Sequence, residues 1–231
     1  MTDPMKLWDF NDPAGSERRF REVAATMSGD DRAAHLTQVA RALGLQEECA
    51  EGLHVLDDIT DAGPHARIHI ALERGRLLRS TGRPAEALAH FTDAERLAEK
   101  GDRDELRIDA MHMIALTAGP QDQLAVKLAA LDLARASDDH RARDWDAPLL
   151  TNIGMTHTEA GNHEVALEKF KEALAARERI GNIETIQVAQ WMVAWSLRNL
   201  GRHGEALKMQ HALKAELDSD EERQPAPDAT R

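Results

Sequence analysis

The sequence contains few aromatic residues and almost no cysteine. Phe, Trp and Tyr together make up 3% of the residues, tyrosine is missing, and the single cysteine, Cys49, excludes an internal disulfide. Val, Ile and Thr form none of the short alternating runs that are typical of strands. Alanine, leucine, glutamate and arginine are abundant instead, and these residues are favourable in helices. The composition therefore predicts an all-α protein.

Positive charge and long apolar runs are also scarce. The formal net charge of −12 repels phosphate backbones, so we expect no nucleic-acid partner. No stretch approaches the roughly 20 apolar residues that span a bilayer, and the N-terminus has no basic segment followed by an apolar one. We therefore expect a soluble, cytoplasmic protein without a membrane partner.

The chain lacks the sequence motifs of common enzymes. GxSxG, GxxxxGKS/T, GxGxxG and HExxH are all missing, so we expect no enzyme activity, although a catalytic site assembled from scattered residues stays an alternative. His65 and His69 could place two imidazoles on one helix face. Because no further His or Cys pair follows at ligand spacing, we interpret both as solvated surface residues and expect no metal and no cofactor.

A pattern recurs along the chain. Each copy reads apolar helix end, glycine, polar pair and then Ala-Leu at the start of a second amphipathic stretch, over residues 78–97, 157–176 and 197–216. Residues 43–59 fit when Glu47 replaces the turn glycine and Gly52 the alanine. Residues 107–134 supply a further copy, with Gly119-Pro120 as the turn and Ala125 as the small residue. Such self-similarity indicates a repeat protein.

These segments resemble the tetratricopeptide repeat (TPR) family, whose unit is a helix-turn-helix of about 34 residues. The resemblance implies a right-handed superhelical solenoid of antiparallel helix pairs, with about five repeats and an N-terminal capping helix. Ala125, Ala166 and Ala206 are spaced more widely than the family unit. This spacing resembles the kinesin-light-chain-like branch, in which the helices are longer, and we expect a bacterial member.

The resemblance also assigns small residues to the helix crossings. Two helices that pack closely need little side chain where they cross, and these positions are Ala40, Gly75, Gly154 and Ala194 in the first helices and Gly52, Ala87, Ala166 and Ala206 in the second. The turn glycines Gly82, Gly161 and Gly201 should adopt a left-handed conformation. We expect a large side chain to destabilise at Gly154 and to matter much less at Gly15.

The two ends differ in composition. Asp12 can cap a helix that begins with Pro13, and residues 13–27 then form a capping helix with an apolar stripe. The sequence from 218 combines acids and prolines without an apolar cluster. We therefore predict three parts, which are an N-terminal segment with its cap (1–28), a TPR-like solenoid (29–217) and a disordered acidic tail (218–231).

In the family, the first helix of each repeat lines a concave groove. The resemblance places there Thr37, Gln38, Arg41, Leu72, Glu73, Arg76, Arg79, Thr151, Asn152, Met155, Glu159, Trp191, Trp195 and Arg198. Chaperone-tail-binding members use a Lys, Asn and Arg clamp in the groove. Here Thr37 and Leu72 stand where Lys is expected and only Asn152 agrees, which argues against a chaperone tail as the ligand.

Trp191, Trp195 and Arg198 lie opposite the core sector of their predicted helix. Two tryptophans and an arginine have the composition of a binding hot spot, but they could also pack under a neighbouring repeat or form a homo-oligomer surface. Arg41, Arg76 and Arg79 could bind carboxylates of a ligand in bidentate fashion, or pair with nearby acids of the chain itself.

The favoured function is a non-catalytic adaptor or regulatory scaffold. It would hold a peptide or helix of a protein partner in the groove, at Arg41, Glu73, Arg76, Arg79, Asn152, Met155, Trp191, Trp195 and Arg198. Two alternatives stay open. The chain could be a solenoid that senses a small molecule, similar to the sensor arrays attached to bacterial transcription regulators, or an enzyme whose site carries no motif.

Overall fold

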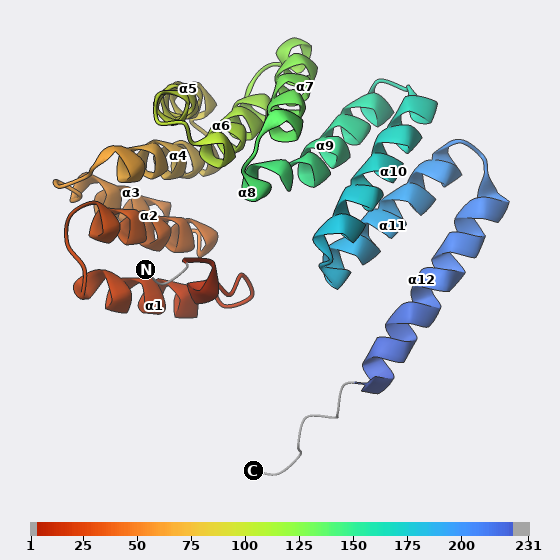
Figure 1. Ribbon diagram of the computed structural model, residues 1–231, viewed down its shortest axis with the longest axis horizontal. Coiled ribbons are helices and arrows are strands. Elements are labelled where there is room, and N and C mark those ends of the chain that lie inside the picture. The colour runs from red at the N-terminus through yellow and green to blue at the C-terminus, as the bar shows by residue number, and fades with distance from the viewer. Residues whose placement is uncertain (1–3, 224–231) are drawn as a thin grey trace. The chain divides into compact units, whose positions relative to one another are not determined.

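The computed structural model describes residues 4–223, and within this range it contains helices and no strand (Figure 1). The all-α prediction is confirmed. The chain divides into two compact units, residues 1–143 and residues 144–231. None of the helices in the described range is long and apolar enough to cross a membrane.

Unit 1 begins with a short 3-10 helix and a capping helix. These are η1 (Pro4–Leu7) and α1 (Pro13–Ala25), and they precede three helix pairs: α2 (Gly29–Leu45) with α3 (Cys49–Asp57), α4 (Pro64–Ser80) with α5 (Pro84–Lys100), and α6 (Asp104–Thr117) with α7 (Pro120–Ala136). A short helix, α8 (His140–Arg143), ends the unit. The first helices of the pairs are neighbours, because α4 contacts both α2 and α6.

Unit 2 consists of two helix pairs. They are α9 (Asp146–Glu159) with α10 (His163–Ile180) and α11 (Ile183–Asn199) with α12 (His203–Arg223), and Figure 1 shows the four helices side by side. Together the described residues therefore hold five pairs and a cap, as predicted. The second helix of the last pair continues to Arg223. The prediction that a disordered tail starts at residue 218 is thus wrong for 218–223, and residues 224–231 lie outside the described range.

The N-terminal cap follows from local chemistry. The Asp12 carboxylate accepts a hydrogen bond from the Gly15 amide at 2.9 Å, and Pro13 occupies the first turn, where no backbone N–H is needed. Phe20 is completely buried and packs in the core of the first pair. A Cβ on Gly15 would lie 1.8 Å from an Asp12 carboxylate oxygen, so this side chain would have to move, and the expected tolerance at Gly15 stays a prediction.

The predicted turns have the backbone conformation that the repeat requires. Gly82, Gly161 and Gly201 have φ values of 75°, 76° and 70°, and Glu47 takes the same left-handed conformation with φ of 66°. A glutamate therefore ends the first helix of the first pair, whereas glycine ends α4, α9 and α11. The interpretation of residues 43–59 as a repeat is confirmed by this turn.

The helix crossings are tight where small residues were predicted. A Cβ on Gly75 would lie 2.4 Å from the ring of Phe91, and one on Gly154 would lie 2.7 Å from the ring of Phe170. Both rings are fully buried. In each case the aromatic ring of the second helix fills the space that the missing side chain leaves, which holds the pair together.

The register of the third pair differs from the prediction. Ala125 is exposed, whereas Lys127 is only 5% exposed and is followed by buried Leu131 and Ala134. These residues repeat the spacing of Ala87, Phe91 and Ala94 in α5. A lysine therefore occupies the position at which we expected alanine, which is why the sequence pattern was misread there.

Candidate partner-binding surface

In unit 1, the predicted groove arginines are bound by acids of the chain itself. Arg76 forms an ion pair with Glu73, and its Nη2 atom lies 2.6 Å from both carboxylate oxygens of Asp109. Arg41 lies 3.6 Å from the same Glu73 oxygen. Glu73 is 1% exposed, so the network forms part of the interior between α2, α4 and α6.

Asp109 was not among the predicted site residues. Burial alone would raise the pKa of this carboxyl group, but the charge and hydrogen bonds of Arg76 hold the pKa below its usual range. Asp109 stays ionised and neutralises Arg76. Arg79, in contrast, is exposed at the end of α4, and Thr37 and Leu72 are completely buried. The interpretation as internal ion pairs therefore holds for Arg41 and Arg76.

Trp8 covers the first predicted groove residues. Its indole Nε1 donates a hydrogen bond to the Gln38 side chain at 3.1 Å, and the Arg41 guanidinium lies 5.8 Å from its ring centroid. Phe10 stacks on the Trp8 ring, with 4.9 Å between the two ring centroids. No sequence pattern links Trp8 to α2, so its contact with Gln38 could not be anticipated.

We predicted that the two histidines of α4 are solvated surface residues, and this prediction is wrong. The His65 and His69 rings lie 4.7 Å apart in a T-shaped arrangement, and both are partly buried. Burial, followed by the charge of His65, lowers the pKa of His69 to about 4. Among the described residues, no group of three or more His, Cys, Asp or Glu side chains is arranged to hold a metal ion.

In unit 2, α11 presents tryptophans to its outer side. Trp191 is 46% exposed and stacks on Trp195, with 6.4 Å between the ring centroids and 11° between the ring planes. Trp195 is partly buried, and its ring meets the edge of Phe170 at 6.1 Å. Arg198 is exposed. Helical periodicity therefore predicted correctly that Trp191 and Arg198 face away from the core. Trp195, in contrast, lies partly in the core.

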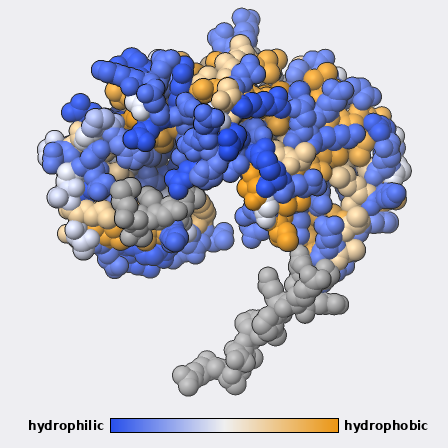
Figure 2. Space-filling model, viewed as in Figure 1, coloured by the Kyte–Doolittle hydropathy of each residue, from blue (hydrophilic) through white to orange (hydrophobic). Residues whose placement is uncertain are grey.

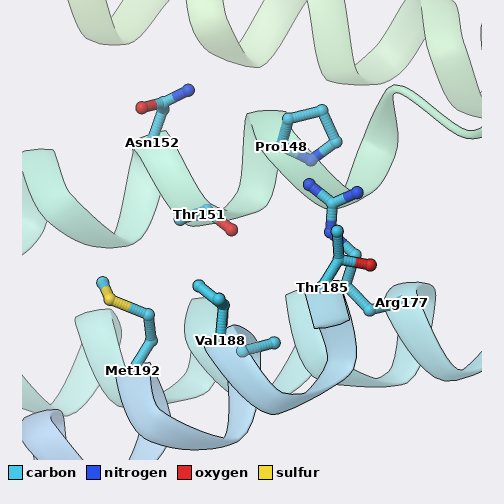
Figure 3. A pocket seen from close by; sticks show the side chains of 8 residues that line it. Pro148, Thr151, Asn152, Arg177, Thr185, Val188 and Met192 are labelled. Atoms are coloured by element: carbon cyan, nitrogen blue, oxygen red, sulfur yellow. The ribbon is translucent and has the colours of Figure 1, made fainter. Parts of the chain in front are cut away.

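A pocket opens between α9 and α11 (Figure 3). It has a volume of about 200 Å³ and is lined by Pro148, Thr151, Asn152, Arg177, Thr185, Val188, Ala189 and Met192. Asn152 was a predicted site residue, and Met155, one turn further along α9, packs partly buried against the core of the unit. The residues from α10 and α11 were missed because the sequence analysis considered one row of positions on each first helix.

Large apolar side chains continue from this pocket onto the surface. Val188 at the pocket is 62% exposed, and Ile183 at the start of α11 is also 62% exposed. In Figure 2, hydrophobic residues reach the visible surface of unit 2 between hydrophilic ones. We call the outer side of α11 with its pocket, from Thr185 to Trp195, the α11 face.

Comparisons with known proteins agree with this fold. The sequence model of the tetratricopeptide repeat family matches residues 149–180, which correspond to most of α9 and all of α10. A search of curated proteins gave no match. The family model therefore matches one helix pair, and the assignment of the other pairs rests on the fold.

Several solved structures share the TPR-like fold. BtubC (BKLC) from P. vanneervenii has a TM-score of 0.64 at 13% identity, with 100% of this chain and 97% of that chain covered. TPR-like repeats attributed to a kinesin light chain of Podosopora anserina give 0.64 at 16% identity, covering 86% and 100%. A STAND protein with a tetratricopeptide repeat sensor from Pyrococcus horikoshii gives 0.72 at 12% identity, covering 90% and 33%. The predicted resemblance to TPR proteins of the kinesin-light-chain type is confirmed.

Proposed function

We propose that this protein is a non-catalytic binding module that holds a peptide or short helix of a protein partner on the α11 face. The observation that carries the proposal is the exposure of Val188 and Trp191, at 62% and 46%, on a helix whose opposite side is buried in the core. A helix that only packs against its own unit would place polar residues there. Rigid aromatic rings beside a pocket give contact area at low entropic cost.

The fold of related structures supports a recognition role. Besides the tetratricopeptide repeat sensor of Pyrococcus horikoshii, the quorum sensor NprR from B. thuringiensis shares the fold, with a TM-score of 0.62 at 15% identity. The chain covers 59% of NprR. Sensing by these proteins also supports the second candidate, a solenoid that binds a small molecule, which the 200 Å³ pocket could hold.

The test is a selection of peptides from a random display library on the immobilised full chain. We expect enriched peptides, and Trp191→Ala should weaken their binding by about 2 kcal/mol, roughly thirtyfold, as hot-spot residues do. Leu207→Ala is the matched control, because Leu207 is an exposed apolar residue (53%) of α12, outside the α11 face. This control should leave the affinity unchanged.

Other outcomes of these experiments would support a different function. If no peptide is enriched and a metabolite library raises the unfolding temperature instead, the small-molecule sensor replaces the peptide-binding module. If Trp191→Ala converts an oligomer into a monomer while peptide binding stays intact, the α11 face is a self-association surface. Turnover of any metabolite in the same library would support an enzyme.

A further inference from the structure

Two arginines of α10 have opposite surroundings. Arg179 donates hydrogen bonds to both oxygens of Asp146, at 2.8 and 2.9 Å, and to Asp144 at 3.2 Å. Arg177 forms no hydrogen bond or ion pair with any residue of the described range. Its side chain instead extends into the space between α9 and α11 (Figure 3). The acids nearest to it are thus already bound by Arg179.

The unpaired guanidinium of Arg177 is also partly withdrawn from water. Burial lowers the pKa of Arg177 more than the charges of Asp146 and Asp144 raise it. A partly desolvated cation without a direct counter-ion gains more from a ligand carboxylate than a fully solvated one, because less water must be removed. The Arg177 guanidinium is therefore suited to bind an anionic group of a ligand.

The remaining lining of the pocket fits the same ligand. Apart from Arg177, no charged side chain lines it. The Thr151 hydroxyl donates to the Ala147 carbonyl at 3.1 Å, and the Thr185 hydroxyl donates to the Asn182 carbonyl at 3.0 Å. The hydrogen-bond donors left for a ligand are therefore the Arg177 guanidinium and the amide of Asn152.

The walls of the pocket are apolar and suit a short aliphatic stem. Pro148, Val188, Ala189 and Met192 surround the polar groups. A volume of about 200 Å³ has the scale of a single side chain. The pocket therefore offers methylene contacts along its walls and a cation for the end of the same side chain.

We propose that this pocket is a subsite for one acidic side chain, glutamate or aspartate, of the peptide that binds the α11 face. The carboxylate accepts hydrogen bonds from Arg177, and its methylene groups pack against Val188 and Met192. This inference rests on the proposed function. The net charge of −12 repels a strongly acidic partner at long range, so the peptide carries its acid in an otherwise neutral or basic sequence.

The test uses the peptides selected on the full chain. We expect a glutamate or aspartate at one fixed position, and its replacement by the matching amide should weaken binding about tenfold or more, the scale of a charge-assisted hydrogen bond. Arg177→Gln should weaken binding of the acidic peptide by the same factor, and the amide peptide should then bind equally well to wild type and variant.

Lys171→Gln is the matched control, because Lys171 lies on the same helix but is exposed and does not line the pocket. This variant should keep the preference for the acidic peptide. Circular dichroism of Arg177→Gln verifies its fold, and Arg177→Glu provides a second readout, since it should transfer the preference to a peptide with lysine at the same position.

Each remaining outcome overturns the subsite. Peptides that depend on Trp191 but bind equally well with acid or amide leave the proposed function intact and remove the subsite. Peptides that lose affinity on C-terminal amidation, and not on replacement of the acidic side chain, show that the carboxylate is that of the chain terminus. If wild type binds no peptide, the proposed function itself fails and the subsite fails with it.

Discussion

Arginines have different surroundings in the two units. In unit 1, Arg76 forms ion pairs with Glu73 and Asp109, so its guanidinium is not available to a ligand. In unit 2, Arg177 of α10 has no such partner among residues 4–223, and Trp191 is exposed. The difference teaches that a charged residue in a groove position indicates a binding site only if the neighbouring helices leave it unpaired.

The largest effect should come from breaking the network of unit 1. Glu73→Ala leaves Arg41 without its acid and Arg76 with one acid fewer in a buried place, so we expect a loss of about 3 to 5 kcal/mol in the free energy of unfolding. Glu159→Ala, at an exposed glutamate of α9, should change it by less than about 0.5 kcal/mol. Urea unfolding measures both. Equal losses would contradict the comparison between the units.

Helix packing, in contrast, should be alike in the two units. Gly75→Ala and Gly154→Ala each push a methyl group into a buried phenylalanine ring, and we expect each to cost about 1 to 3 kcal/mol. Gly204→Ala is the control, because a Cβ there meets no atom within 4 Å. A large loss at only one of the two crossings would locate the difference between the units in the packing instead of the surface.

Acid should weaken the packing of unit 1 around His69. The pKa of His69 is lowered from 6.5 to about 4 in the folded chain, so the unfolded chain binds more protons in this window and stability falls as the pH falls through it. We expect a loss of about 1 to 2 kcal/mol between pH 7 and pH 5, part of which His69→Asn should remove.

Several charged or titratable groups face His69 and shift its pKa. His65, Arg76 and Arg41 disfavour its protonation, whereas Asp109 favours it. His65 and His112 also have a lowered pKa and contribute in the same direction. Identical pH slopes for wild type and His69→Asn in urea unfolding would show that the acid sensitivity does not come from His69.

The smallest change in stability should come from Trp191. Because its ring is 46% exposed, Trp191→Ala should cost less than about 1 kcal/mol, whereas Trp195→Ala, which removes a ring packed on Phe170, should cost about 2 kcal/mol. Thermal unfolding distinguishes the two. If Trp191→Ala lowers the stability more than this, the Trp191 ring stabilises the fold. Trp191 could then not be assigned to partner binding on the α11 face.

Much of the fold could be predicted because its signals are local. Asp12 before Pro13, and a glycine such as Gly161 between two amphipathic stretches, each determine the backbone within a few residues. Even Glu47 could be identified as a turn from its place in the pattern. The register of α7 could not, because Lys127 occupies a small-residue position, and burial of a lysine is not what composition favours.

The candidate site could be predicted only in part. Helical periodicity was sufficient for Trp191 because exposure depends on the helix face. The partners of Arg76 and the freedom of Arg177 depend on which side chains meet between helices that are distant in sequence, as in the pairing of Arg76 with Asp109. A sequence pattern lists the arginines of a chain, but the packing of neighbouring helices decides which ones remain available to a ligand.

The distribution of tryptophans also determines the fluorescence of the protein. The chain has four tryptophans and no tyrosine, so indole dominates its near-ultraviolet emission over the weak emission of phenylalanine. Trp8 is the one indole of unit 1, while Trp145, Trp191 and Trp195 belong to unit 2. A Trp8→Phe variant would therefore emit from unit 2 only. Its spectrum would report events on the α11 face without any attached dye.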